Sequence, residues 1–135
     1  MKMINRSLPM ALLCIAASHC AHKPKALPGL ADATYLTANV VRISEEFANI
    51  NTDLSGAKLS QYDITPQKAF TFRYKDQTIP ALLGKDYSDV AKGDWVGLIE
   101  EDGNLQLAIS FGNAATKLGC VVGDTLYIKP LSVEE

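Results

Sequence analysis

Hydrophobic positions in this chain fall in short runs that are separated by turn residues. Apolar residues dominate 95–99 and 105–109, and Asp102 and Gly103 lie between these two runs. Glycine adopts a positive φ without steric cost, so Asp-Gly between apolar runs favours a β-hairpin. We therefore predict two antiparallel strands joined by a turn at residues 100–104.

A second hairpin is predicted from alternating aromatic residues. Phe70, Phe72 and Tyr74 occupy every other position, which in a strand places all three rings on one face. We expect this face to pack into the core; the alternative is an exposed stripe that stacks on carbohydrate or bases. After a short loop, residues 78–83 form the predicted return strand, in which Pro80 requires a sheet edge or a bulge.

The remaining predicted elements are short. They are one bent strand or two strands over 33–44, a loop over 45–51, a helical turn over 52–59 capped by Thr52, a helical turn over 113–119 capped by Asn113 and closed by Gly119, and a last strand over 125–128. The weaker of the two helical turns is 52–59, because Ser55-Gly56 interrupts it. Six or seven short strands with regular turns and almost no helix predict an all-β barrel or sandwich.

The first 21 residues have a different composition. Lys2 and Arg6 precede an apolar stretch over 8–17, small residues follow it, and the first acidic residue is Asp32. This order is typical of a secretory signal peptide, and the stretch is too short to span a bilayer comfortably. We expect an exported protein with a signal peptide over 1–21, a tether over 22–32, a barrel domain over 33–130 and a tail over 131–135.

The end of the signal peptide is compatible with two kinds of processing. Cleavage after Ser18 would release a secreted protein. Residues 17–20 instead partly resemble the lipobox of bacterial lipoproteins, which would make Cys20 the lipidated residue, although His19 departs from the small residue of that pattern. Both alternatives place the protein in the bacterial periplasm or envelope, and a lipid on Cys20 would be its membrane attachment.

Charge and cysteine content exclude several classes of function. Residues 32–135 carry 9 basic and 15 acidic side chains without a basic cluster, so we expect no nucleic-acid partner. Cys14 and Cys20 lie in or next to the signal peptide, which leaves Cys120 alone in the domain and predicts neither a disulfide framework nor a zinc site. We expect Cys120 to be a small buried residue rather than a redox-active thiol.

No pattern in the sequence predicts a catalytic or metal-binding residue. Both histidines, His19 and His22, precede the domain, so a Ser-His pair or a histidine-ligated metal is not expected there. Glu100, Glu101 and Asp102 are adjacent in the predicted hairpin turn. We expect solvent to surround these carboxylates; the alternative is a weak site for a cation or a substrate amine.

Three stretches carry a family resemblance. Residues 103–124 read GNLQLAISFGNAATKLGCVVGD, residues 86–94 read DYSDVAKGD, and residues 45–52 contain Phe-Ala-Asn. Together they resemble the C-terminal domain of the S-adenosylmethionine hydroxide adenosyltransferase family, which includes the fluorinating and chlorinating adenosyl enzymes. The resemblance spans about residues 35–129 and implies a small antiparallel β-barrel of about six or seven strands with one short helical turn.

The resemblance also implies a ligand site. In that family, S-adenosylmethionine binds between the N-terminal domain of one protomer and the C-terminal barrel of its neighbour in a trimer. The barrel holds the adenine edge through a Phe-Gly-Asn stretch and an Asn-Ala-Ala backbone. The matching positions here are Phe47, Asn49, Asn113, Ala114 and Ala115, with Ala48 in place of the glycine. An asparagine amide offers a donor and an acceptor, and Phe47 offers a stacking face, so S-adenosylmethionine or adenosine is the implied ligand.

Two departures from the family limit what the resemblance implies. The halogenating members hold the methionine end with a Ser-Arg pair, whereas Glu101 and Asp102 stand there and would repel a carboxylate. A signal-like segment also occupies the place of the family's N-terminal domain, so we expect no adenosyl transfer by this chain alone. We interpret it as an exported, non-catalytic barrel that binds an adenosyl-like ligand. The alternatives are an envelope interaction or homo-oligomerisation module, a subunit completed by a separate catalytic chain, and a motif kept only for its structure.

Overall fold

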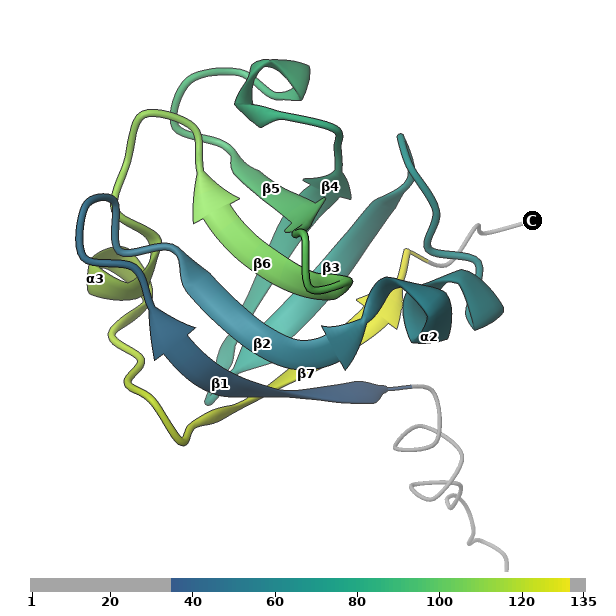
Figure 1. Cartoon of the computed structure of the whole chain (residues 1–135), viewed down its shortest axis with the longest axis horizontal. Helices are drawn as coiled ribbons and strands as arrows, with labels where there is room; N and C mark the ends of the chain where they lie inside the picture. Colours follow the sequence, from purple (N-terminus) through teal and green to yellow (C-terminus); the bar gives the residue numbers. More distant parts are fainter. Residues whose placement is uncertain (1–34, 132–135) are drawn as a thin grey trace, which may run out of the picture. The chain divides into compact units, whose positions relative to one another are not determined.

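Seven strands enclose the main hydrophobic core in the computed structural model, which describes residues 35–131 (Figure 1). The strands are β1 (Leu36–Ile43), β2 (Ile50–Ser55), β3 (Ala69–Tyr74), β4 (Gln77–Leu83), β5 (Trp95–Ile99), β6 (Asn104–Ile109) and β7 (Thr125–Pro130). Short helices α2 (Gly56–Gln61) and α3 (Ala114–Leu118) and the 3₁₀ turn η2 (Tyr87–Asp89) connect them. Around the closed barrel the strand order is β1-β2-β6-β5-β4-β3-β7. The predicted small all-β barrel is confirmed.

One strand pair departs from the antiparallel expectation. β4 and β5 run parallel, with Leu82 opposite Val96 and Leu83 opposite Gly97, while the other neighbouring pairs are antiparallel. A parallel pair cannot be joined by a tight hairpin. The chain therefore crosses from the end of β4 to the start of β5 through residues 84–94, which contain η2. This crossover later supplies part of the candidate site.

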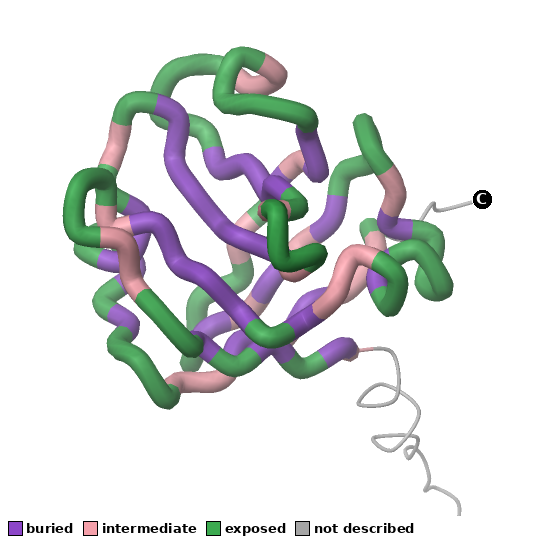
Figure 2. The backbone as a smooth tube through the Cα atoms, viewed as in Figure 1, coloured by how far each residue is buried: buried purple, intermediate pink, exposed green. Residues whose placement is uncertain are grey.

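The core holds the aromatic face predicted on β3. Phe70 and Phe72 are fully buried and Tyr74 nearly so, which confirms the core interpretation and excludes an exposed stacking stripe. Phe72 meets Trp95 edge to face, with ring centroids 5.0 Å apart. Buried positions follow the strands around the barrel (Figure 2).

Both predicted hairpins are confirmed. Between β5 and β6, Gly103 has a φ of 83° and its N–H donates to the carbonyl oxygen of Glu100. In β4, Pro80 lies opposite Thr71 of β3, and pairing with β5 begins only at Leu82. Pro80 thus sits where β4 has one strand neighbour, as its missing N–H requires.

The first strand is continuous. β1 carries a bulge between Val40 and Arg42 in its pairing with β2. Because a bulge inserts an extra residue, the side-chain alternation shifts there. Leu36, Ala38 and Val40 are buried at alternate positions, whereas Arg42, two positions after Val40, is exposed.

The predicted cap of the first helix was wrong, whereas Asn113 stands at the N-cap of α3 as predicted but without a capping hydrogen bond. Thr52 belongs to β2, and its hydroxyl donates to the carbonyl oxygen of Leu105 inside the barrel at 2.8 Å. That buried partner competes with a capping role. Ser55 caps α2 instead, accepting from the N–H of Lys58 at 3.1 Å. At α3 the side chain of Asn113 makes no capping hydrogen bond within the described residues, while Gly119 closes the helix with a φ of 84°, as predicted.

One further prediction is confirmed, and the predictions about the N-terminal segment fall on residues that the structure does not describe. Cys120 is buried, as predicted, and burial raises the pKa of its thiol. Within residues 35–131, no helix combines the length and hydropathy that a membrane span requires. The predicted signal peptide, the tether and Cys20 lie outside the described residues.

Candidate functional site

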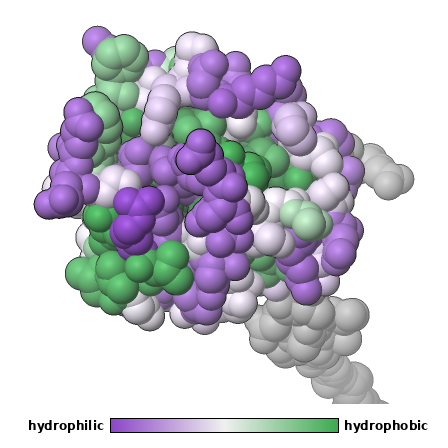
Figure 3. Space-filling model, in the orientation of Figure 1, coloured by the Kyte–Doolittle hydropathy of each residue, from purple (hydrophilic) through white to green (hydrophobic). Residues whose placement is uncertain are grey.

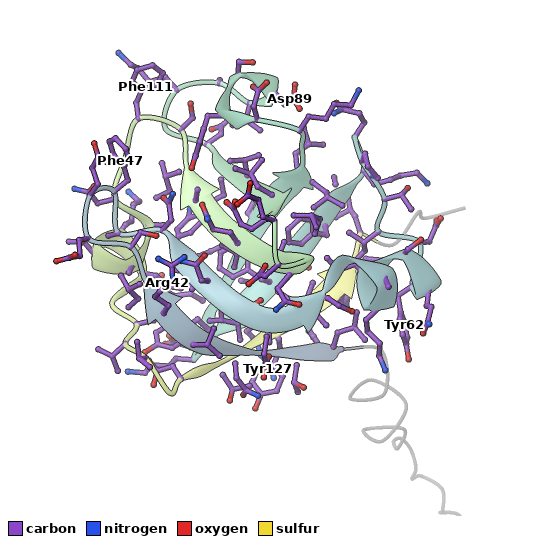
Figure 4. The ribbon with its side chains drawn as sticks, in the orientation of Figure 1. Arg42, Phe47, Tyr62, Asp89, Phe111 and Tyr127 are labelled. Carbon is purple, nitrogen blue, oxygen red and sulfur yellow. The ribbon has the colours of Figure 1, made fainter. Side chains whose placement is uncertain are left out.

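A cavity of about 210 Å³ opens at one edge of the barrel, beside the loop between β1 and β2. Its lining residues come from three connections and one strand end: Phe47, Asn49, Tyr87, Ile109, Phe111 and Gly112. Phe47 and Phe111 project from this same edge (Figure 4). Figure 3 shows hydrophobic side chains on the surface at that side of the view. The lining is thus mostly apolar, with two polar side chains.

The loop between β1 and β2 is fixed by backbone hydrogen bonds at both of its ends. The N–H of Ser44 donates to the carbonyl oxygen of Asn49 at 2.9 Å, and the N–H of Ala115 donates to that of Ala48 at 2.8 Å. Ala48 has a φ of 53°, a left-handed conformation that favours glycine. This is the position at which the resembled family carries glycine. The loop places Asn49 inward and Phe47 outward.

Phe111 adopts a conformation that is rare for an aromatic residue. Its φ is 60° and its side chain is 84% exposed. The ammonium of Lys92 lies 4.9 Å from the ring centroid. A Cβ at Gly112 would come within 2.6 Å of Ile109 Cγ2, so only glycine fits beside it. Residues held in strained backbone conformations cluster at functional sites, so Phe111 is a candidate binding residue.

A chain of hydrogen bonds starts at Asn49 and leads away from the cavity. Asn49 Nδ2 donates to the Tyr87 hydroxyl at 2.9 Å, and this hydroxyl donates to Gln106 Oε1 at 3.3 Å. Gln106 Nε2 donates in turn to the Glu100 carboxylate. We call Asn49, Tyr87, Gln106 and Glu100 the polar chain. It runs along the outer side of β6, because the neighbouring Leu105 and Leu107 point into the core.

A second asparagine supports the polar chain from the side. Asn51 lies opposite Gln106 in the sheet, and its Oδ1 accepts from Gln106 Nε2 at 3.2 Å. The same oxygen accepts from the Arg42 guanidinium at 3.3 Å, while Asn51 Nδ2 donates to Ser44 Oγ at 3.2 Å. Both asparagines and Gln106 are at most 7% exposed. Buried polar side chains that satisfy one another in this way hold a single arrangement.

One atom of this network is left without a partner. Asn49 is 5% exposed, and nothing in the described part of the chain hydrogen bonds to its Oδ1. Leaving a buried acceptor unsatisfied costs about 1–3 kcal/mol. Asn49 lines the cavity, but its unpaired Oδ1 is itself buried, so the side chain would have to turn before a ligand could reach that oxygen. The mostly apolar cavity could take a flat ring, with Phe47 and Phe111 beside the opening.

The acidic turn between β5 and β6 is structural. Asp102 Oδ1 accepts from the N–H of Asn104 at 2.9 Å, and Glu100 takes part in the polar chain. Glu101 is exposed. Among residues 35–131, no group of three histidine, cysteine or acidic side chains is arranged to hold a metal ion.

The five residues implied by the family resemblance lie close together, but they do not all reach the cavity. Phe47 and Asn49 line it. Asn113 is exposed, and Ala114 and Ala115 are buried in the core next to it. The N–H of Ala115 already binds Ala48, so it is not free for a ligand. The binding roles of all five residues stay predictions.

Sequence reasoning missed four lining residues: Tyr87, Ile109, Phe111 and Gly112. The strongest signal was Phe111, a large aromatic residue in a short connection directly before a glycine. Tyr87 lies in the stretch 86–94 that carried the family resemblance. Its contact with Asn49 joins positions 38 apart in the sequence, which no local pattern reveals.

Comparisons with known proteins agree on the fold. A model of the SAM hydroxide adenosyltransferase C-terminal domain family matches residues 38–127. The chain is similar to an uncharacterized conserved protein from Thermotoga maritima, with a TM-score of 0.65 and 21% identity, over 68% of this chain and 35% of that one. It is also similar to a conserved hypothetical protein from Thermus thermophilus, with a TM-score of 0.50 and 18% identity, over 68% of this chain and 34% of that one. The chain therefore spans about a third of each of these proteins. A search of curated proteins gave no match.

Proposed function

This chain belongs to the SAM hydroxide adenosyltransferase C-terminal domain family, and from that premise we propose that its barrel binds the adenine ring of an adenosyl-like ligand beside Asn49. The observation that carries the proposal is the mostly apolar cavity lined by Phe47, Asn49 and Phe111, in which Asn49 also has an unpaired, buried Oδ1. The exocyclic amine of adenine would donate to that oxygen once the Asn49 side chain turns it toward the cavity. Phe47 and Phe111 offer aromatic faces to the same ring.

The size of the cavity supports binding of one ring system rather than of a whole cofactor. Its volume of about 210 Å³ lies below the roughly 300–1,000 Å³ that is usual for drug-sized ligands. An adenine ring would enter, and the sugar and its substituent would stay outside. A second surface is then needed to cover the rest of the ligand.

A second function is favoured by the exposed aromatic side chains. Phe111 is 84% exposed and Phe47 is 53% exposed, at the rim of one cavity. A second copy of this barrel, or a separate chain, would cover both rings and complete the site. The barrel would then act as an interaction or oligomerisation module, with or without a ligand between the subunits.

The proposed setting is the bacterial envelope, and the proposed role is non-catalytic. The signal-like composition of residues 1–21 supports export, with lipidation at Cys20 as one route of attachment. Residues 35–131 contain no histidine, and Asp102 and Glu100 at the turn between β5 and β6 are engaged in holding that turn and the polar chain. Binding or scavenging of a nucleoside therefore suits this barrel better than catalysis.

The test is a titration of the purified chain with adenosine and with S-adenosylmethionine, followed by calorimetry and by amide NMR shifts. Micromolar affinity corresponds to about 8 kcal/mol, and NMR extends detection to millimolar affinity. The ligand-induced changes in amide chemical shift should centre on Phe47 and Asn49, and Phe47→Ala should lower the affinity for the ligand. Val122→Ala, an equally exposed apolar position that is not in the lining, is the matched control.

The outcomes separate the two functions. Absence of heat and of shifts at millimolar ligand would refute the nucleoside site. Sedimentation that shows concentration-dependent self-association, weakened by Phe47→Ala and not by Val122→Ala, would then support the interaction module.

A further inference from the structure

We propose that the outer side of the barrel, where β1, β7 and β3 are neighbours, docks on an anionic phospholipid surface through the phosphates of the lipid headgroups. The side chains that form this surface, which we call the basic–aromatic face, are Tyr35, Arg73, Tyr127 and Lys129. None of the four lines the nucleoside cavity. The inference therefore goes beyond the proposed function and is tested separately from it.

The register of the sheet gathers the four side chains on the outside of the barrel. Arg73 lies opposite Tyr127 in the pairing of β3 with β7. Tyr127 and Lys129 stand on either side of Ile128, which is fully buried, so both point outward (Figure 4 labels Tyr127). Tyr35 directly precedes β1. All four side chains are half-buried and therefore remain partly accessible.

Two aromatic rings hold the two cations of this face. The rings of Tyr35 and Tyr127 meet edge to face, with centroids 6.3 Å apart. The guanidinium carbon of Arg73 lies 4.9 Å from the Tyr35 centroid and 5.3 Å from the Tyr127 centroid. Lys129 Nζ lies 5.2 Å from the Tyr35 centroid. A ring restrains a cation without neutralising it, so the N–H groups stay able to donate to an oxyanion.

Neither cation has an anionic partner in the part of the chain that the structure describes. The salt bridge found within residues 35–131 joins Lys68 to Asp63 and involves neither Arg73 nor Lys129. Two positive charges beside the same tyrosine ring repel each other. A phosphate group that contacts both would relieve this repulsion, and phosphate is an anion that arginine and lysine bind well.

The basic–aromatic face is positive on a domain that is acidic as a whole. Residues 32–135 carry 9 basic and 15 acidic side chains. Thr71 and Thr125, which share the outer side of β3 and β7, are uncharged. On the neighbouring strand β2, the carboxylate of Asp53 is engaged by Asn39 Nδ2 at 2.9 Å. An anionic surface would repel the domain as a whole and attract this face, which orients the barrel.

The two tyrosines favour a lipid surface over a free phosphate ion as the occupant. Tyrosine is enriched at the headgroup level of membranes, because its ring packs against apolar groups while its hydroxyl stays in water. A free phosphate ion would use the two charges and leave the rings of Tyr35 and Tyr127 exposed to water. A bilayer surface would use the charges and the rings together.

The course of the chain leads to the same face. Residues 1–34 join the barrel at Tyr35, and Cys20, the predicted lipidation site, is 15 residues before it. At about 3.5 Å per residue, a lipid on Cys20 would keep Tyr35 within about 50 Å of the bilayer. Stable attachment takes two signals, such as an acyl chain and a basic patch. The basic–aromatic face would supply the second signal.

The first test measures binding of the purified full chain to vesicles by flotation. We expect tighter binding to equal mixtures of phosphatidylglycerol and phosphatidylcholine than to phosphatidylcholine alone, with the difference reduced by salt. Arg73→Gln combined with Lys129→Gln should weaken binding to the anionic vesicles by at least about tenfold, since each basic residue near such a surface contributes roughly fivefold. Binding to the neutral vesicles should not change.

A matched double variant controls for total charge. Lys85→Gln combined with Lys117→Gln removes the same two charges from exposed positions in the β4–β5 crossover and in α3. It should change binding to the anionic vesicles by less than about twofold, because these lysines are outside the basic–aromatic face. An equal loss in both double variants would show that total charge, and not this face, governs binding.

A second measurement needs no substitution. Nitroxide-labelled lipid in the anionic vesicles broadens the amide NMR signals of residues near the surface. We expect the strongest broadening at Arg73, Tyr127 and Lys129. Broadening should be weak at Gln106 on β6, which is separated from β7 by β1 and β2 in the strand order. Broadening centred on Gln106, or equal in both places, would refute the proposed orientation.

The remaining outcomes are also decisive. Equal binding to neutral and anionic vesicles, or a folded Arg73→Gln, Lys129→Gln variant that binds like the unaltered chain, would overturn the proposal. Titration with inorganic phosphate separates the two sources of the anion. If millimolar phosphate shifts the amide signals of Arg73 and Lys129 while anionic vesicles do not bind this face, the face holds free phosphate and membrane docking is refuted. The outcome of the nucleoside titration bears on none of these results.

Discussion

The backbone N–H of Ala115 donates a 2.8 Å hydrogen bond to the carbonyl oxygen of Ala48. This bond joins the first turn of α3 to the loop between β1 and β2, two segments far apart in the sequence. It stabilises the loop that carries Phe47 and Asn49. It also occupies a donor that a ligand would otherwise use, so the adenine contact that we propose depends on the Asn49 side chain.

Replacing Asn49 by alanine should separate binding from stability. The variant loses the 2.9 Å bond to Tyr87, worth about 1 kcal/mol, but it also removes an acceptor for which residues 35–131 offer no donor. We expect a loss of less than about 1 kcal/mol in the free energy of unfolding and at least tenfold weaker adenosine binding. Urea denaturation and NMR titration measure the two effects.

Thr116→Ala is the matched control for Asn49→Ala. Thr116 is exposed and does not line the cavity, so the variant should bind adenosine as the unaltered chain does. A large stability loss with unchanged affinity for Asn49→Ala would refute its role as a ligand contact.

Ala48→Gly should be nearly neutral. Relief of the left-handed conformation contributes about 1–2 kcal/mol. Greater freedom of the unfolded chain costs about 0.4–1 kcal/mol, and loss of the partly buried methyl group costs up to about 0.8 kcal/mol. We expect the free energy of unfolding to change by less than about 1 kcal/mol.

Ala38→Gly provides the comparison for Ala48→Gly. Ala38 is fully buried in β1, so glycine there loses the methyl group and gains no relief of strain. It should be more destabilising by at least about 1 kcal/mol in urea denaturation. Equal losses for the two variants would show that the φ of Ala48 stores no strain.

Local chemistry explains which parts of this fold were predictable. The β5–β6 hairpin follows from Gly103, and the core face of β3 from the alternation of Phe70, Phe72 and Tyr74. The parallel pairing of β4 with β5 was missed because it is made through a crossover whose residues carry no signal of direction. The cap of α2 was missed because Thr52 finds its partner across the barrel.

The candidate site was predictable only where the family resemblance reached. Phe47 and Asn49 were found in this way, and they line the cavity. Tyr87 and Gln106 were missed because hydrogen bonds between distant segments define their roles. The orphaned oxygen of Asn49 is a property of the folded chain, so only the structure reveals it.

Gly103→Val should destabilise the barrel through the backbone alone. The φ of Gly103 is 83°, and no described atom other than its immediate neighbours lies within 4 Å of a Cβ placed there. A left-handed conformation costs about 1–2 kcal/mol for ordinary residues and more for a β-branched one. Urea denaturation of Gly103→Val should show at least that loss in the free energy of unfolding. Gly103→Asn should lose less stability, since asparagine tolerates the left-handed region. A valine variant as stable as the unaltered chain would contradict the turn geometry.

Asp124 should contribute to a loss of stability in acid. Hydrogen bonds from the N–H of Val121 at 2.9 Å and from the Tyr74 hydroxyl at 2.7 Å hold the pKa of the Asp124 carboxyl below its usual value. The unfolded chain therefore takes up the proton first. The stabilisation is present above the unfolded pKa, near 3.8, and disappears as the pH falls through the lower folded pKa.

Asp124→Asn tests this linkage. The variant should be less stable than the unaltered chain at pH 7 and should lose less stability between pH 5 and pH 2, as measured by urea denaturation at each pH. Asp76→Asn, in the exposed β3–β4 turn, is the control. Parallel stability curves for the Asp124 variant and the unaltered chain would contradict the assignment.

Phe111→Asn should show that the strained aromatic is kept for binding rather than for folding. Asparagine tolerates a φ of 60° better than phenylalanine, so the substitution relieves backbone strain and stabilises the folded chain by about 1 kcal/mol. The lost contact with Lys92 costs about 0.5–1 kcal/mol at an exposed site. Because the ring is 84% exposed, little buried area is lost, and the free energy of unfolding should stay unchanged or rise slightly. Adenosine affinity, or self-association where that is the function, should fall by at least threefold, since one stacking face is worth about 1 kcal/mol. A clear drop in stability with binding intact would show instead that Phe111 serves the fold.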